Sequence, residues 1–199
     1  MYKSHLFVLI STILLKSAIG QTDYLSIGNK YLANEEYSNA EKTFREATKS
    51  DPSNTIYQCQ LALALLNQQE YKDAQTILTV VLSRDTANVG ALWYSGLNNF
   101  QNEAGDLRKA IMFFEKALLY INKNSRQFYS GNWFIGQSYH ILLQTDGLTY
   151  NEVSKMLECY AIYLQLQPDA DDAKKISSFV QHIKEIRPSS NVEKWVNKS

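Results

Sequence analysis

Histidine and cysteine have the widest catalytic and metal-binding chemistry of the side chains in this sequence, and both are scarce. There are three histidines and two cysteines: His5, His140, His182, Cys59 and Cys159. A zinc site needs several such residues at short spacing, and a catalytic triad needs a nucleophile beside its base and an orienting acid. Here each residue stands far from the others in the sequence. We therefore predict no catalytic residues, no metal site and no cofactor.

Cys59 and His140 form the one pairing that would suggest a thiol nucleophile with a base. They fall in different structural repeats, described next, and nothing in the sequence orients one toward the other. Cys59 and Cys159 lie about two repeats apart, roughly 20 Å when helices pack near 10 Å. A disulfide needs α-carbons within about 7 Å, so we interpret both cysteines as small, unbridged core residues.

Eight residues near the start of the chain have the spacing of a helix hairpin. Small residues at Gly28 and Ala40 let two helices approach closely where they cross, and aromatic residues fill the space beside them. Ser38 and Glu41 predict a capping box at the start of the second helix, and a proline ends it. The whole set is Tyr24, Ile27, Gly28, Tyr31, Ala40, Phe44, Ala47 and Pro52.

This set resembles the tetratricopeptide repeat, a unit of about 34 residues made of two antiparallel helices. The resemblance implies an all-α, right-handed α-solenoid of about four helix hairpins. The repeats are predicted at 21–54, 55–88, 89–124 and 125–168. A capping helix follows at 169–187, and a flexible tail at 188–199.

The later repeats depart from the pattern in length. In the third, the turn from Asn102 to Asp106 holds two extra residues, which is a place for local function or a tolerated surface insertion. In the fourth, the stretch from Gly136 to Met156 is eight residues longer than expected, so its helices are predicted to be longer or wider apart. Thr149 and Glu152 predict another capping box there.

Residues 1–20 have the features of a secretory signal. An apolar run of about ten residues lies between Lys3 and Lys16, and small residues lead to Gly20. The run is about half the length of a membrane span, so we expect cleavage after Gly20 and a periplasmic or secreted protein with no membrane span in the mature chain. The mature chain carries 18 basic and 20 acidic residues, so we expect no nucleic-acid partner.

The resemblance also implies that the first helix of each repeat lines a concave groove. The residues mapped to this groove are mainly apolar and aromatic, and Trp93, Phe100 and Trp133 are the expected anchors. Grooves that clamp a peptide carboxylate need several Lys, Arg and Asn side chains, and only Asn29 matches. The predicted partner-binding residues are Leu25, Asn29, Leu63, Trp93, Leu97, Phe100, Trp133, Gln137 and His140, with Cys59 beside them.

The predicted function is a non-catalytic scaffold or adaptor in the bacterial cell envelope that binds an apolar peptide or helix in this groove. Three alternatives stay open: a periplasmic immunity or inhibitor protein, a small-molecule binder that uses the groove, and a homo-oligomer. Aromatic residues of such repeats also pack between neighbouring helices, so the anchors can belong to the core instead. The fold leaves the identity of the partner undetermined.

Overall fold

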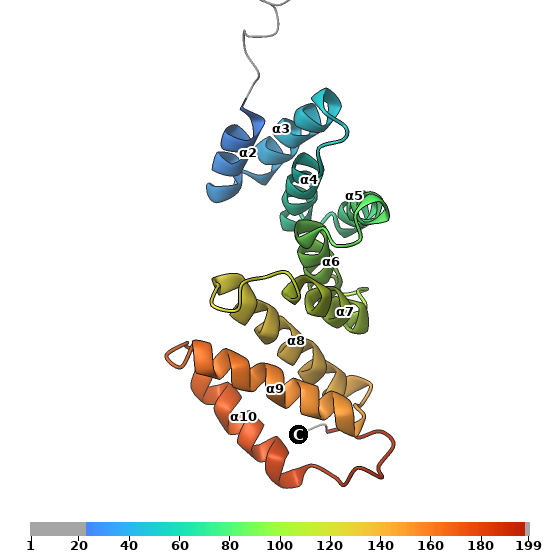
Figure 1. Ribbon diagram of the computed structural model, residues 1–199, viewed down its shortest axis with the longest axis vertical. Helices are drawn as coiled ribbons and strands as arrows, with labels where there is room; N and C mark the ends of the chain where they lie inside the picture. Colours follow the sequence, from blue (N-terminus) through green and yellow to red (C-terminus); the bar gives the residue numbers. More distant parts are fainter. Residues whose placement is uncertain (1–22, 198–199) are drawn as a thin grey trace, which may run out of the picture.

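The computed structural model describes residues 23–197, and within them the chain is all-α (Figure 1). The helices of this part are α2 (Tyr24–Ala33), α3 (Tyr37–Ser50), α4 (Thr55–Asn67), α5 (Tyr71–Arg84), α6 (Val89–Gln101), α7 (Leu107–Leu118), α8 (Arg126–Thr145), α9 (Tyr150–Leu166) and α10 (Ala173–Ile186). None of them is long and apolar enough to cross a membrane. The predicted signal, residues 1–20, lies outside the described residues.

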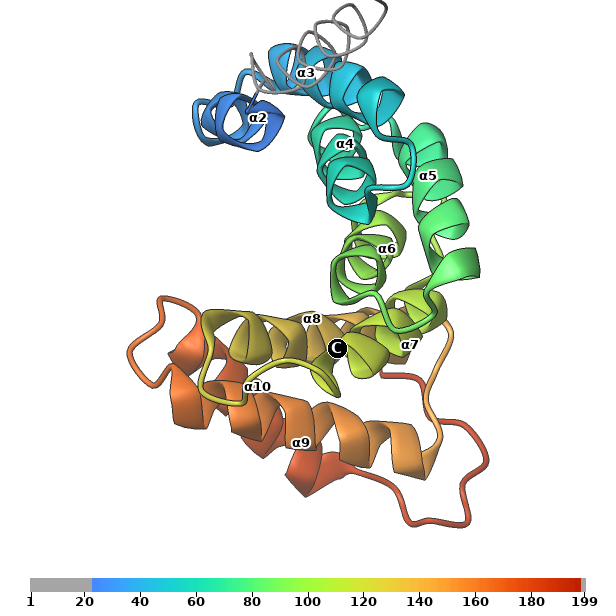
Figure 2. The same cartoon turned by 45° about the horizontal axis from the view of Figure 1, so that its top comes forward.

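Consecutive helices pair as hairpins, and the hairpins stack in chain order. The pairs α2/α3, α4/α5, α6/α7 and α8/α9 fall within the four predicted repeats, and α10 packs on α9. Figure 2 shows the stack as an arc, with α4 and α6 toward its inner side and α5 on its outer side. The prediction of an all-α repeat solenoid is confirmed.

One contact recurs inside three hairpins and explains the glycine of the pattern. In the third repeat, a β-carbon on Gly96 would lie 2.7 Å from the ring of Phe114. In the fourth, a β-carbon on Gly136 would lie 2.7 Å from the ring of Tyr160. Gly28 meets the ring of Phe44 in the same way. The buried ring of the second helix thus packs directly on the backbone of the first.

The core runs through the whole stack. One cluster of buried side chains fills the first two repeats, and another fills the third, the fourth and α10. Leu82, Tyr94 and Leu97 pack against both clusters and join them. Each hairpin therefore depends on its neighbours for burial, as in other repeat solenoids.

The two predicted capping boxes have different outcomes. At α9 the prediction is confirmed: the N–H of Glu152 donates to the Thr149 hydroxyl, and the Glu152 carboxylate accepts from the N–H of Thr149 at 2.8 Å. At α3 it is wrong, because the helix already begins at Tyr37 and no side chain caps it.

The polar groups predicted to cap α3 instead connect two repeats. The Ser38 hydroxyl donates to Gln68 Oε1 at 2.7 Å, and Gln68 Nε2 donates to Glu41 at 2.8 Å. Both bonds join α3 to the residue that follows α4. The hydrogen-bond partner, Gln68, belongs to the neighbouring repeat. The sequence around Ser38 and Glu41 therefore does not show whether these two side chains cap the helix or bond to another repeat.

The fourth hairpin is longer than the others, as predicted. Helix α8 has 20 residues and α9 has 17, whereas α2 to α7 have 10 to 14. The extra residues therefore extend both helices. The α8/α9 turn lies against the start of α7, where Arg108 pairs with Asp146 at 2.9 Å and also with Glu152 at the start of α9.

The described part of the chain after α10, where the sequence predicts a flexible tail, folds back onto this turn. Leu148 and Trp195 exchange two backbone hydrogen bonds of 2.8 Å, and Lys194 Nζ lies 2.8 Å from Asp146. Leu148 is fully buried, and its backbone groups need partners that the turn does not supply. The Trp195 backbone supplies them.

Candidate functional site

The inner face of the first three repeats carries a ladder of polar side chains. Gln60 on α4 donates to Asn29 on α2 at 2.5 Å, and the Tyr94 hydroxyl on α6 donates to Gln60 at 3.3 Å. Each bond joins the first helices of two neighbouring repeats. This half of the groove therefore presents amides that already bind one another.

The next part of the inner face is aromatic. Phe100 at the end of α6 lies 6.3 Å from Trp133 and 5.1 Å from Phe134 between ring centroids. All three rings are half-buried and pack against the C-terminal core. They form a continuous surface from the third repeat to the fourth, where a partner can contact ring edges and faces.

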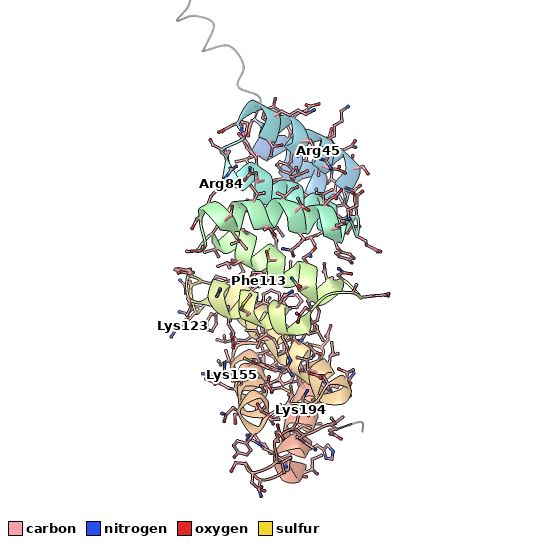
Figure 3. The ribbon with its side chains drawn as sticks, turned by 90° about the vertical axis from the view of Figure 1, so that its right-hand side faces the viewer. Arg45, Arg84, Phe113, Lys123, Lys155 and Lys194 are labelled. Atoms are coloured by element: carbon pink, nitrogen blue, oxygen red, sulfur yellow. The ribbon has the colours of Figure 1, made fainter. Side chains whose placement is uncertain are left out.

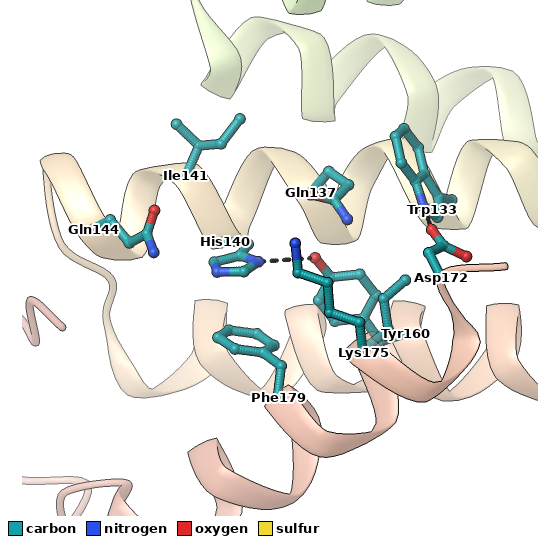
Figure 4. A pocket seen from close by; sticks show the side chains of 10 residues that line it. Trp133, Gln137, His140, Ile141, Gln144, Tyr160, Asp172, Lys175 and Phe179 are labelled. Atoms are coloured by element: carbon teal, nitrogen blue, oxygen red, sulfur yellow. Dashed lines mark hydrogen bonds between the residues drawn. The ribbon is translucent and has the colours of Figure 1, made fainter. Parts of the chain in front are cut away.

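Beside this surface, a cleft of about 630 Å³ lies between α8 and α10. Its size is in the range of ligand and peptide-anchor pockets. Figure 4 shows the rings of His140 and Phe179 stacked on one another in the cleft, with the Lys175 side chain beside them. The cleft is lined by Trp133, Gln137, His140, Ile141, Gln144, Tyr160, Asp172, Lys175, Ile176 and Phe179.

Asp172 fixes one end of this cleft. Its carboxylate accepts from Trp133 Nε1 at 2.7 Å and from the Tyr163 hydroxyl at 2.7 Å (Figure 4 shows the first of these). These bonds hold the start of α10 to both α8 and α9. Burial and the adjacent Asp172 carboxylate raise the pKa of Tyr163, so this phenol keeps its proton at neutral pH.

His140 lies at the centre of the cleft. Its ring stacks on Phe179 with centroids 3.8 Å apart, and its Nδ1 lies 3.4 Å from the Tyr160 hydroxyl. Burial, together with the nearby Lys175 ammonium, lowers the pKa of His140, which keeps the ring neutral at pH 7. The imidazole thus contributes an aromatic surface and one hydrogen-bonding nitrogen.

Trp93 requires a correction. It was expected to anchor a partner in the groove, but its side chain is only 9% exposed. The ring packs edge-on against Phe114 at 5.3 Å and Phe134 at 6.1 Å. Phe134 of α8 packs against this position, so Trp93 belongs to the core and is not accessible to a partner in this structure.

The other predicted groove residues divide between core and surface. Leu25, Leu63 and Leu97 are half-buried, with Leu25 and Leu97 packed against the core, and Asn29 is exposed. The structure brings Trp133, Gln137 and His140 together in the α8/α10 cleft. Phe100 contacts Trp133 at the edge of this cleft.

Sequence reasoning missed two sets of groove residues. Gln60 and Tyr94 occupy the sixth position of their repeats, one place beyond a position taken to face the groove. Asp172, Lys175 and Phe179 belong to α10, which was interpreted only as a cap. The sequence held one signal for this second set. A capping helix must bury one of its faces on the preceding hairpin, so the side chains of α10 that point toward α8 could have been expected beside the groove.

The cysteines are not bridged: Cys59 is buried in the core as expected, and Cys159 is half-buried against it. Burial raises the pKa of Cys59 to about 11 and that of Cys159 to about 12, so both remain thiols at neutral pH. Cys59 Sγ lies 3.6 Å from Asn88 Oδ1, in a hollow between α4 and α6 that does not include His140. The thiol and base pair does not form.

Between residues 23 and 197, no group of three or more His, Cys, Asp or Glu side chains is placed to hold a metal ion. The described residues thus define a helical repeat solenoid with an aromatic inner surface. That architecture is typical of proteins that bind other proteins.

Comparison with known proteins identifies the type of repeat. Residues 24–54 match the tetratricopeptide repeat family. A crystal structure of MamA is 20% identical over 82% of each chain, with a TM-score of 0.63. A structure of MamA from Desulfovibrio magneticus RS-1 is 16% identical, covers 85% of this chain and 100% of that one, and has a TM-score of 0.60. No curated protein matches the sequence.

Residues 24–54 form a tetratricopeptide repeat, and the chain shares the helical-repeat solenoid fold of these solved structures. At this level of identity, the MamA structures support the fold alone. Proteins built from these repeats are generally non-catalytic scaffolds for protein interaction, and the fold supports that general function here.

Proposed function

We propose that this protein is an adaptor in the bacterial cell envelope, and that it binds an apolar peptide or an amphipathic helix on the aromatic part of its inner face. The observation that carries the proposal is the continuity of Phe100 and Trp133 with the α8/α10 cleft. Ile141 extends this surface and is 38% exposed. Half-buried aromatic rings beside an open cleft are typical anchors for a partner.

The charges of the cleft agree with an apolar partner. Lys175 is the one cationic side chain among the lining residues, and Asp172 is already bound by Trp133 and Tyr163. Burying a strongly charged segment against these rings would cost desolvation that few groups here offset. An amphipathic helix would place its apolar face on the cleft and keep its charges toward water.

The polar ladder of Asn29, Gln60 and Tyr94 makes the other end of the groove polar, in contrast to the aromatic end. These side chains bind one another across α2, α4 and α6, so a partner that displaces them has to replace those bonds. The ladder therefore favours partners whose apolar part is confined to the α6–α10 region.

A substitution at the cleft tests the binding surface. We expect Ile141→Glu to weaken capture of the envelope partner at least about tenfold, because a carboxylate would be buried against apolar side chains. The measurement is quantitative cross-linking and purification from the cell envelope, followed by titration with a synthetic peptide of the captured segment. Met112→Glu is the matched control, because Met112 is also 38% exposed but lies on α7, outside the cleft.

Both variants should keep the helicity and unfolding midpoint of the wild type. Equal capture by Ile141→Glu and wild type would remove the cleft from the binding surface. Loss of capture by both variants would point to a non-specific charge effect. A partner that binds only as a small soluble molecule would favour the alternative function, a small-molecule binder that uses this groove.

The proposed location has its own test. We expect the mature protein in the envelope fraction to begin at Gln21, which N-terminal sequencing or intact mass determines. A mature chain that begins at Met1 in the cytoplasmic fraction would contradict the envelope location and leave the binding surface unaffected.

A further inference from the structure

The α8/α10 cleft carries hydrogen-bond donors that no described residue uses. Gln137 and Gln144 of α8 and Lys175 of α10 line the cleft, and their side chains form no hydrogen bond or ion pair within residues 23–197. Each amide brings two N–H groups, and the ammonium brings three. Gln137 is half-buried, and the other two side chains are exposed. A ligand in the cleft can therefore reach all three of them.

Lys175 differs from other lysines of the C-terminal half in having no counter-charge. Lys155 lies 3.0 Å from Glu115. Lys194 lies 2.8 Å from Asp146, and Figure 3 labels both of these lysines. Lys175 forms no such pair with a described carboxylate. An anion placed beside it would be held more strongly than in open water, because the apolar walls of the cleft lower the local dielectric constant.

The acidic side chain of the lining, Asp172, does not supply that anion. One of its oxygens accepts from Trp133 Nε1 and the other from the Tyr163 hydroxyl, each at 2.7 Å. Figure 4 shows this carboxylate at the Trp133 end of the cleft. In the same view the Lys175 side chain extends toward His140. The ammonium therefore faces the part of the cleft whose lining holds no carboxylate.

His140 adds a donor to the same part of the cleft. The Tyr160 hydroxyl lies 3.4 Å from His140 Nδ1, which is its one hydrogen-bond partner in the described chain. Burial raises the pKa of this phenol, so it keeps its proton and donates to Nδ1. The neutral imidazole then carries its own proton on Nε2, where no described residue accepts it.

The walls around these donors are apolar. Trp133 and Phe179 present half-buried rings, and Ile141 is 38% exposed. The volume of about 630 Å³ lies in the range of small-molecule pockets. An inorganic anion would leave these walls uncovered. A carboxylate on an apolar body fits both features, because its two oxygens accept from neighbouring donors while its body covers the rings.

We infer that the α8/α10 cleft binds a small apolar carboxylic acid in its ionised form. Its oxygens accept from Lys175, Gln137 and His140. Its apolar body packs on Trp133 and Phe179. This ligand is additional to the protein partner proposed above, and its binding does not depend on that partner. Because Trp133 also belongs to the proposed partner surface, the bound acid and the partner would compete for the cleft; this consequence alone rests on the proposed function.

The test is an NMR titration of the mature protein that follows the ring C–H signals of His140 and the side-chain amide signals of Gln137. The probe is 4-phenylbutyrate, raised to about 10 mM, and its neutral counterpart is 4-phenylbutanamide. We expect the acid to shift both residues and to bind at least about tenfold more tightly than the amide, because only the acid pairs with an ammonium. His182, which is exposed on α10 outside the cleft lining, should not shift.

Lys175→Met tests the role of the cation. Methionine keeps an unbranched apolar side chain without the charge, and the exposed position should tolerate it. We expect this variant to bind the acid about tenfold more weakly and the amide as the wild type does. Lys174→Met is the matched control, because Lys174 is also exposed on α10 but lies outside the cleft lining. It should bind the acid as the wild type does.

Three results would overturn the inference. The first is that 4-phenylbutyrate shifts neither His140 nor Gln137. The second is that folded Lys175→Met binds the acid as tightly as the wild type, or that acid and amide bind equally. The third is that an acetylated apolar tetrapeptide with a free C-terminal carboxylate shifts the same signals at lower concentration, which would define a site for a peptide terminus instead. The capture experiment with Ile141→Glu is read separately, so failure of this inference and failure of the proposed function are distinguishable.

Discussion

Replacing Trp93 by serine is expected to lower the free energy of unfolding by about 3–5 kcal/mol, the range for removing a large aromatic side chain from a core. Trp93 is 9% exposed and contacts the rings of Phe114 and Phe134 at its edges. Serine would leave a cavity between the third and fourth repeats and bury a hydroxyl without an assigned partner. Urea unfolding followed by far-UV circular dichroism measures the loss.

Ile56→Ser is the control for this prediction, since Ile56 is 57% exposed on α4 and its removal should change stability by no more than about 0.5 kcal/mol. The prediction also separates two roles for Trp93. A Trp93→Ser variant with wild-type stability and lost partner binding would restore Trp93 to the groove. If the variant is destabilised, any loss of binding is explained by unfolding, and Trp93 keeps its place in the core.

The second large effect is expected at Gly96. A β-carbon there would lie 2.7–2.8 Å from three atoms of the Phe114 ring, and this fully buried ring is packed against the rings of Trp93 and Phe134. We expect Gly96→Ala to lower the free energy of unfolding by about 1–3 kcal/mol, although alanine favours helix formation by about 1 kcal/mol. Thermal and urea unfolding of the purified variant measure the net change.

Gly90→Ala is the matched control because Gly90 lies on the same helix. A β-carbon at Gly90 would meet its nearest atom, Cys59 Sγ, at 3.5 Å, which is ordinary contact. We expect Gly90→Ala to be neutral or slightly stabilising. Equal behaviour of the two variants would mean that the contact between helix backbone and ring does not set the spacing of the hairpin.

Gly96 and Phe114 also show why the fold could be predicted from the sequence. The glycine and the ring stand on the two helices of one hairpin, at a fixed separation along the chain. The same pairing recurs at Gly28 with Phe44, and at Gly136 with Tyr160. Local spacing therefore determined the hairpins, their order and the extra length of the fourth, because each depends on contacts within one repeat or with the next.

The candidate site could be predicted only in part, and Trp93 and Trp133 show the reason. Both occupy the same position of their repeats, yet one is buried and the other lines the cleft. What differs is the neighbouring repeat: Phe134 packs on Trp93, whereas α10 leaves a cleft beside Trp133. A repeat pattern assigns both residues the same role and does not contain this difference.

The sequence by itself determined the helical hairpins and the general class of scaffold. The tertiary structure decided which aromatic rings are accessible, that α10 completes a cleft with α8, and that the tail docks on Leu148. The physical reason is the sequence separation of the contacts. Hairpins form through contacts between residues close in sequence, whereas the exposure of side chains and the shape of clefts depend on how separate repeats and the two ends of the fourth hairpin pack together.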